Sequence, residues 1–200
     1  MLLELLTVHL WLALGLWIVV YVADYYLTLA GARLYAQGVQ RVVVFEGSYE
    51  LNPLFQQDID RRRRISTRFL VMLGVTCLLI AFAWRGVKVR WFPPGVFRLW
   101  MGALLLVELV IMIRHVRNII TFRQILSSAD IVGQIQYPRW WSLRSSALDL
   151  GLFGALFAVC ALIADPWFFL GGTLACGSAA LQHFRHSRKA RSTAPQTVKG

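Results

Sequence analysis

Residues 69–84 of the chain read FLVMLGVTCLLIAFAW, and residues 96–113 read VFRLWMGALLLVELVIMI. The first stretch has no charged residue, and the second has only Arg98 and Glu108. Helices that cross a bilayer need roughly 20 mostly apolar residues, and these stretches are close to that length. Three further apolar stretches flank these two, at residues 5–22, 146–164 and 167–184. The sequence therefore predicts an all-α fold, a polytopic membrane helix bundle with about five transmembrane helices.

The composition agrees with a membrane protein, because 58% of the residues are hydrophobic and they are grouped in blocks. The formal net charge is +11, and the cations lie between the apolar blocks. Cations at such positions contact anionic lipid head groups, which predicts lipid as a partner and argues against nucleic acid. We expect a single transmembrane helical domain over residues 1–186. Residues 187–200 are predicted to form a basic, disordered cytoplasmic tail.

The distribution of Lys and Arg predicts the orientation of the chain. With five spans, 17 of the 21 Lys and Arg residues fall on one side of the membrane. The positive-inside rule then places the amino terminus outside and the carboxy terminus in the cytoplasm. The amino terminus lacks the basic segment of a cleavable signal peptide, since its first charge is Glu4. These features predict a multi-pass protein of the plasma (cell inner) membrane without a cleaved signal.

Two of the spans are expected to continue as helices beyond their apolar stretches. The first continues through Asp24 and Thr28 toward Tyr35. The third continues past Arg123 as an amphipathic helix in the membrane interface, because its apolar positions lie between cations. Only Asp165-Pro166 separates the fourth and fifth spans, which predicts a tight helical hairpin.

Ionisable residues inside the predicted spans are the most informative feature of the sequence. Asp24, Glu108 and Asp149 lie within or beside spans, and His115 lies at a membrane boundary. With the predicted topology, all four fall in the cytoplasmic half of the membrane. A charged side chain in a bilayer costs several kcal/mol, so such residues are usually functional or paired.

Helical spacing brings several of these residues onto shared faces. Glu108 and His115 share one face of their helix, and Asp24 and Thr28 share another, since they are two turns and one turn apart. The cytoplasmic segment 50–53 adds the polar side chains of Glu and Asn. We therefore predict a polar cavity open to the cytoplasm. Its candidate residues are Asp24, Thr28, Glu50, Asn52, Glu108, His115 and Asp149.

Local pairing is an alternative interpretation of the acids. Asp24 or Asp149 could pair with Arg33, Arg114 or Arg144, and Glu108 could be protonated within the bundle. Arg117 is interpreted as a marker of the positive-inside boundary. His183 and His186, which precede the basic tail, are expected to be solvated.

Small residues form two stripes on the fifth span. They are favourable positions for close helix packing. We expect this packing to lie within the chain rather than at a dimer interface. The stripes consist of Gly171, Ala175 and Ala179, and of Gly172, Cys176 and Ala180.

Two short motifs, Asp24-Tyr25-Tyr26-Leu27-Thr28 and Glu50-Leu51-Asn52-Pro53, support a resemblance. The chain resembles an uncharacterised family of small bacterial and archaeal multi-spanning membrane proteins. That family has a D-x-x-x-T motif at the end of one span and an E-x-N-P motif before the next. The resemblance covers about residues 5–85. It implies that Asp24, Thr28, Glu50 and Asn52 form one polar constellation, and it supplies no activity.

Three classes of function are compatible with these features. The first is an accessory or scaffold component of a membrane complex, with a membrane protein partner or a second copy of the chain. The second is binding or transport of a cation, a proton or a small polar solute by the acidic cluster. The third is an intramembrane enzyme that uses a divalent metal or acid–base chemistry. Its metal candidates are Glu108, His115, Asp24 and Asp149, but catalysis is the less favoured interpretation because no spacing is diagnostic of it.

Overall fold

The fold is known from a computed structural model that describes residues 2–47, 50–128 and 130–193. Helices dominate it, and the all-α prediction is confirmed apart from two short strands. The elements in chain order are α1 (Leu2–Val8), α2 (Leu10–Gln37), η1 (Val39–Arg41), β1 (Val43–Phe45), α3 (Gln56–Asp60), α4 (Thr67–Lys88), α5 (Pro94–Ser127), β2 (Ile135–Tyr137), α6 (Arg139–Ile163) and α7 (Pro166–Thr193).

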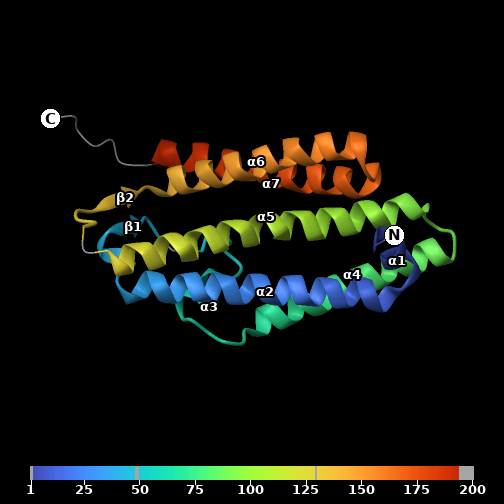
Figure 1. Cartoon of the computed structure of the whole chain (residues 1–200), viewed down its shortest axis with the longest axis horizontal. Coiled ribbons are helices and arrows are strands. Elements are labelled where there is room, and N and C mark those ends of the chain that lie inside the picture. Colours follow the sequence, from blue (N-terminus) through green and yellow to red (C-terminus); the bar gives the residue numbers. More distant parts are fainter. Residues whose placement is uncertain (1, 48–49, 129, 194–200) are drawn as a thin grey trace.

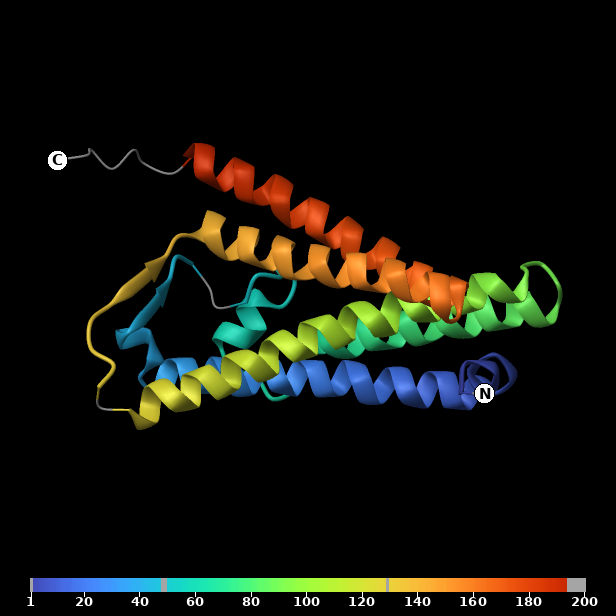
Figure 2. The ribbon, with the colours of Figure 1, turned by 45° about the horizontal axis from the view of Figure 1, so that its top comes forward.

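Five long helices form an elongated bundle and alternate in direction along the chain (Figures 1 and 2). We call the end that carries β1, β2 and the described carboxy terminus the sheet end. The opposite end carries α1 and the turns at residues 89–93 and 164–165, and we call it the turn end. Because directions alternate, α2, α5 and α7 all run toward the sheet end.

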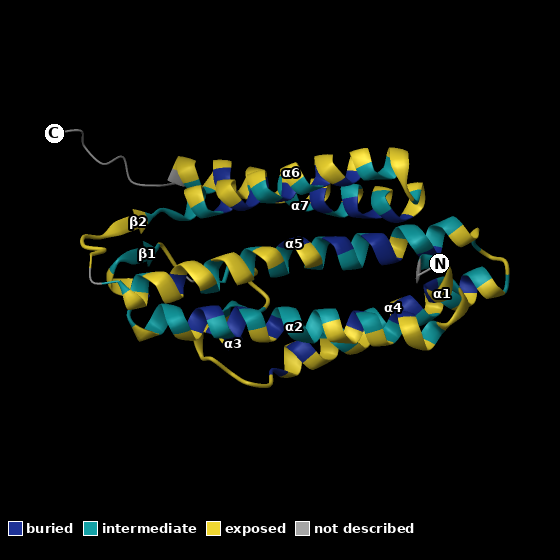
Figure 3. Cartoon of the chain, in the orientation of Figure 1, coloured by how far each residue is buried: buried dark blue, intermediate teal, exposed yellow. Residues whose placement is uncertain are grey.

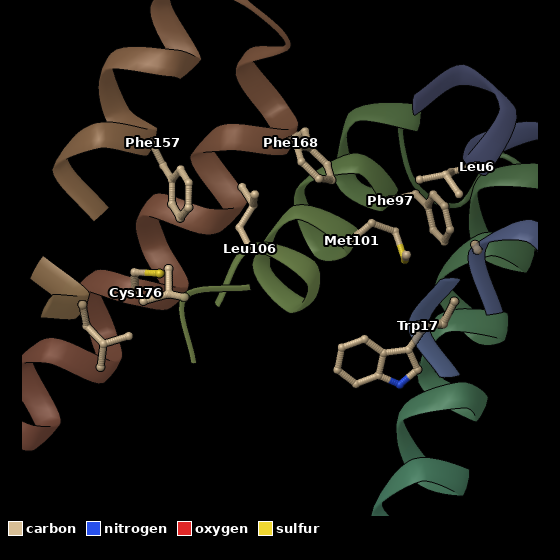
Figure 4. Close-up of a cluster of buried hydrophobic side chains, with 12 residues drawn as sticks. Leu6, Trp17, Phe97, Met101, Leu106, Phe157, Phe168 and Cys176 are labelled. Carbon is tan, nitrogen blue, oxygen red and sulfur yellow. The ribbon is translucent and has the colours of Figure 1, made fainter. Parts of the chain in front are cut away.

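Helix α5 is the centre of the bundle. It contacts α2 and α4 on one side and α7 on the other. Figure 4 shows Met101 on the side of Trp17 from α2, and Leu106 on the side of Phe157 and Cys176 from the α6–α7 hairpin. These buried side chains belong to one hydrophobic core that connects the two parts of the bundle.

The α6–α7 hairpin is confirmed, with α6 ending at Ile163 and α7 beginning at Pro166. Asp165 stabilises the turn, because its Oδ1 accepts a hydrogen bond from the backbone N–H of Phe168 at 2.9 Å. Its Oδ2 forms an ion pair with Arg98 of α5, also at 2.9 Å. A carboxylate at a helix N-terminus satisfies an unpaired N–H and interacts well with the helix dipole. The ion pair also ties the hairpin to α5.

Glycines allow α5 and α7 to approach at backbone distance. A Cβ atom added at Gly171 would overlap the carbonyl oxygen of Leu99, and one added at Gly102 would overlap that of Phe168. A Cβ at Gly172 would meet the side chain of Leu106. The small-residue stripe of α7 therefore packs inside the chain, as expected.

The outer faces of the bundle are apolar. Figure 3 shows exposed residues along the outward sides of α4, α6 and α7. Large apolar side chains such as Leu78 and Leu162 are 72% and 85% exposed. Four helices, α2, α4, α5 and α6, are long and apolar enough to cross a membrane, with mean hydropathy of 1.7 to 2.2. Residues 182–193 of α7 are mostly polar or basic, and α7 is not among these four.

The first span differs from the prediction at its beginning. The helix begins at Leu10, and residues 5–8 belong to the separate helix α1. The break is at His9, whose backbone is extended with φ −113° and ψ 104°. Beyond this break the prediction is confirmed, because α2 continues through Asp24 and Thr28 as far as Gln37.

Two other helices, α5 and α7, continue beyond the apolar stretches of their predicted spans. Helix α5 continues past Arg123 to Ser127 as predicted, although as one continuous helix of the bundle. Helix α7 runs to Thr193, through the first part of the predicted tail. Contacts with α6 explain this, because the hydroxyl of Ser187 donates to the carbonyl of Trp140 at 2.7 Å, and the guanidinium of Arg191 lies over the Trp140 ring. Residues 194–200 of that tail lie outside the described residues.

The two strands form a small parallel pair that was not predicted. Val43 lies opposite Ile135 and Phe45 opposite Tyr137. The pairing is parallel because α2 and α5 run in the same direction, so the segments that follow them leave the bundle side by side. Three-residue strands have no recognisable sequence period, and their partner is about 90 residues away.

The buried carboxylate of Asp58 organises the segment that precedes α4 and fixes it against α2. Asp58 is 3% exposed, and its carboxylate accepts a 2.6 Å hydrogen bond from the hydroxyl of Ser66 and an ion pair at 3.3 Å from Arg63. The carbonyl of Arg63 in turn accepts a hydrogen bond from the hydroxyl of Tyr25 on α2 at 2.9 Å. Ser66 also caps the N-terminus of α4. This network places the preceding residues 50–55 beside α2 and α5.

Candidate functional site

A cavity of about 120 Å³ lies between α2, α5 and the segment 50–59. We call it the inner cavity. Most of its polar lining comes from the residues that the sequence singles out. It is lined by Tyr21, Asp24, Tyr25, Thr28, Glu50, Asn52, Phe55, Ile59, Phe69, Glu108, Ile111 and His115.

The structure thus brings six of the seven predicted site residues around one cavity. Asp24 and Thr28 come from α2, Glu108 and His115 from α5. The helical spacing of each pair places its two residues on one face, and the neighbouring positions of α2 and α5 bring the faces together. This is also the constellation that the D-x-x-x-T and E-x-N-P motifs imply.

The segment that contains Glu50 and Asn52 folds as a local turn. The carboxylate of Glu50 accepts a hydrogen bond from the backbone N–H of Asn52 at 2.6 Å. The side-chain oxygen of Asn52 accepts one from the N–H of Leu54 at 3.1 Å. Asparagine favours such turns because its side chain can replace a backbone acceptor. Glu50 is partly buried and Asn52 is exposed, and both line the cavity.

His115 connects α5 to α2 through a short hydrogen-bond chain. Its Nε2 lies 2.9 Å from the hydroxyl of Thr28 and 3.5 Å from Oδ1 of Asp24. The Thr28 hydroxyl donates to the backbone carbonyl of Asp24 at 3.0 Å. A hydroxyl has a single proton, so when Thr28 gives it to the Asp24 carbonyl, Nε2 of His115 is the donor to Thr28. In the neutral ring, Nδ1 is then a hydrogen-bond acceptor.

Several polar atoms of this site are buried without a hydrogen bond to any described residue. They include Oε2 of Glu108, Nδ1 of His115 and Oδ1 of Asp24, and the last has only the 3.5 Å ion-pair contact with His115. Most buried polar atoms in proteins have a hydrogen-bond partner, and leaving one unpaired costs about 1–3 kcal/mol. The inner cavity is therefore a place where a bound ligand or water would satisfy existing groups.

Asp149 does not join this set. Its Oδ2 lies 3.4 Å from Nε of Arg114 and 3.2 Å from Nη2 of Arg117, so it forms ion pairs between α6 and α5. Arg114 also donates a 2.7 Å hydrogen bond to the hydroxyl of Ser146. Pairing with Arg114 is one of the local alternatives considered for this acid. Arg117 has a specific partner in addition to its position at the predicted boundary.

The candidate metal ligands do not converge on a metal site in the described ranges 2–47, 50–128 and 130–193. Within them, no group of three or more His, Cys, Asp or Glu side chains is placed to hold a metal ion. Asp149 is occupied by arginines, and His115 contacts Thr28 and Asp24. The divalent-metal interpretation therefore has no preformed ligand set among these residues.

A second cavity of about 600 Å³ lies at the sheet end, between α5, α6, α7 and the segment 50–53. We call it the outer cavity. It shares Glu50, Asn52, Ile111 and His115 with the inner cavity, so the two are adjacent. Its other polar and basic lining residues are Arg114, Asn118, Arg139, Gln182, His183, His186 and Lys189.

The sequence analysis did not assign this second group to a site. His183 is half-buried and lines the outer cavity, although it was expected to be solvated. The available signal was the continuing helix: His183 and His186 are three residues apart and therefore share a face of α7. Recognising that signal required the helix to continue past residue 184, where the predicted fifth span ended.

The position of Glu50 in the loop leads to a pH-dependent prediction. Burial raises the pKa of this carboxyl above its ordinary value, although the Asn52 N–H and Arg114 oppose the shift. A raised pKa in the folded state means that folding favours the protonated form. This contribution to stability is present at pH values below the unfolded pKa of about 4.3 and is lost as the pH rises through the folded pKa.

We expect Glu50→Gln to be more stable than the wild type near neutral pH, with little difference at pH 4. Thermal unfolding of both proteins from pH 4 to pH 8 would measure this, and the difference in midpoint should grow with pH. A difference that is constant across the range would contradict the prediction.

No protein-family model matches this chain, and no curated protein or solved structure is significantly similar to it. The fold and the cavities define its class: an all-α helix bundle with four helices suited to a membrane and a polar cavity between two of them. The family resemblance of its two motifs stays a prediction.

Proposed function

We propose that this is a five-span protein of the plasma membrane, with its amino terminus outside and its sheet end in the cytoplasm. The alternating directions of the five long helices support this topology. Helix α7 would complete the fifth span as the partner of α6 in the hairpin. Of the 21 Lys and Arg residues, 17 belong to segments that this topology assigns to the cytoplasmic side, where they would contact anionic lipid head groups.

We further propose that the inner cavity binds a small monovalent cation. The observation that carries this proposal is the convergence of Asp24 and Glu108 on one cavity with buried carboxylate oxygens that lack hydrogen bonds. In a medium of low dielectric constant, a carboxylate attracts a cation far more strongly than in water. Thr28 and Asn52 add neutral oxygen atoms of the kind that hard cations prefer.

The size of the cavity agrees with such a ligand. A volume of about 120 Å³ holds roughly four water molecules at about 30 Å³ each. This is enough for an alkali-metal ion with part of its hydration shell or for a small protonated amine. Aromatic side chains of Tyr21, Tyr25 and Phe69 form the remaining wall, and aromatic faces also attract cations.

This proposal takes precedence over the accessory role that the sequence favours. That role relied on small-residue faces and basic segments for contacts with a partner. The glycine face of α7 packs on α5 within the chain. A role in a larger complex and an enzymatic role both stay predictions, because no specific geometry supports them.

The test is cation binding by the full-length protein in a mild detergent. Sodium, potassium and methylammonium chloride would each be titrated against N-methylglucamine chloride, with heat or tryptophan fluorescence as the signal. We expect one of these cations to bind. Asp24→Asn and Glu108→Gln should each weaken that binding by at least about tenfold, since each removes a charge-assisted contact of roughly 1.5–3 kcal/mol.

The matched control is Asp130→Asn, which neutralises an exposed acid away from both cavities. It should bind the cation as the wild type does. The proposal fails if the wild type binds none of the three cations, or if the two cavity variants bind as tightly as the control.

A further inference from the structure

The outer cavity has a different chemistry from the inner one. Its basic residues Arg114, Arg139 and Lys189 come from three different helices, α5, α6 and α7. Glu50 is the one acidic residue among its described lining residues. Arg114 forms an ion pair with Asp149, and Arg139 and Lys189 supply two further positive charges to the lining.

A buried nitrogen atom of the half-buried His183 adds a second, independent observation. The ring of His183 lines the outer cavity, and its Nδ1 is buried without a hydrogen bond to any described residue. Asn118 and Gln182 supply further amide donors to the same space. Buried polar atoms are rarely left unpaired, so this wall is prepared for a hydrogen-bonding partner that does not come from the described chain.

We propose that the outer cavity binds the phosphate group of an anionic ligand. Guanidinium and ammonium groups are the usual protein partners of phosphate, and their hydrogen bonds to it are charge-assisted. Neutral amide and imidazole N–H groups complete such sites. The mixture of cations with Ile111 and Leu143 suits a phosphate that carries an organic substituent.

The size and place of the cavity limit the source of the phosphate. A volume of about 600 Å³ lies within the range of sites for small organic molecules, so it can hold more than inorganic phosphate. In the proposed topology the cavity lies at the cytoplasmic level of the lipid head groups. The phosphate can therefore belong to an anionic lipid or to a soluble organic phosphate, and the experiment separates the two.

This inference does not depend on cation binding in the inner cavity. Variants in the two cavities separate the two proposals, since Glu108→Gln should leave phosphate binding unchanged. Arg139→Gln with Lys189→Gln should in turn leave cation binding within about twofold of the wild type. Either proposal can consequently fail without the other.

The test compares two double variants of the full-length protein. Arg139→Gln/Lys189→Gln removes one cation from α6 and one from α7 inside the cavity. Arg144→Gln/Arg188→Gln removes one from each of the same helices at exposed positions that do not line it. Both variants lose the same net charge, so non-specific electrostatic attraction falls equally.

Two probes are used at neutral pH. Binding of radiolabelled inorganic phosphate is measured by equilibrium dialysis in detergent. Lipid binding is measured by native mass spectrometry after extraction from nanodiscs of phosphatidylcholine and phosphatidylglycerol. We expect at least one probe to bind the wild type, and the cavity variant to bind it at least about tenfold more weakly than the control variant does.

Each outcome has a defined meaning. If the cavity variant loses binding of phosphatidylglycerol alone, the site is supported and the ligand is a lipid. If the cavity variant loses binding of inorganic phosphate alone, the site is supported and the ligand is a soluble phosphate. The inference is overturned if the wild type binds neither probe, or if both double variants lose binding equally. His183→Ala gives a second measurement, since it removes a hydrogen-bonding group from the cavity wall without changing the net charge of the protein at neutral pH.

Discussion

Gly171→Ala is expected to lower the free energy of unfolding by at least about 3 kcal/mol, although it adds only one methyl group. The new Cβ would overlap the carbonyl oxygen of Leu99 and lie 2.7 Å from the backbone nitrogen of Ala103. Both obstacles are backbone atoms in the N-terminal third of α5, so no side-chain rotation can relieve the overlap. The two helices would have to separate, and the ion pair between Arg98 and Asp165 would be strained with them.

Gly177→Ala is the matched control on the same helix. Nothing lies within 4 Å of a Cβ atom at that position. Alanine favours helix over glycine by up to about 1 kcal/mol, so this variant should be as stable as the wild type or slightly more stable. Unfolding of the purified proteins by sodium dodecyl sulfate in mixed micelles would measure both. Equal stability of the two variants would show that α5 and α7 are not in backbone contact.

Asp149→Ala is expected to destabilise the protein by about 1–3 kcal/mol, the usual cost of removing the hydrogen-bond partner of a partly buried charged group. The carboxylate of Asp149 balances the charge of the Arg114 guanidinium, which is only 20% exposed and lies at the head-group level of the proposed topology. Ser146 still accepts a hydrogen bond from Arg114 in this variant, but a neutral hydroxyl does not balance the charge.

A double variant separates the effect of the lost carboxylate from a general loss of packing. Arg114→Met/Asp149→Leu replaces the pair with apolar side chains and leaves no buried charge, so it should be more stable than Asp149→Ala alone. Unfolding in mixed micelles again measures all variants. If the double variant is the less stable one, the ion pair itself stabilises the bundle and the unpaired charge is not the main cost.

Much of the architecture could be predicted from sequence because it depends on local properties. Apolar stretches predict long helices wherever they occur, and Asp165-Pro166 ends one helix and begins the next without help from other segments. The grouping of Asp24 with Thr28 and of Glu108 with His115 also follows from helical spacing alone. The sequence assigned seven residues to one cavity, including Glu50 and Asn52 from the segment 50–53, and six of the seven line it.

Other features depend on neighbours that are distant in the chain. Asp149 has the same residue type and predicted depth as Asp24, yet it pairs with Arg114 and Arg117 because α6 packs on α5 with that rotation. His183 lines a cavity because α5, α6 and the segment 50–53 lie around its part of α7. No periodic pattern carries such information.

The sequence by itself determined that the chain forms long apolar helices, which residues share each helical face, and that Asp24, Glu108 and Asp149 lie within or beside apolar stretches. These properties depend on side-chain chemistry and on a repeat of 3.6 residues per turn. Only the tertiary structure decided which faces meet, that the glycines of α5 and α7 bring two backbones together, and that an acidic cavity and a basic cavity lie side by side. The physical reason is that the relative rotation and separation of packed helices are set by the fit of all their side chains together.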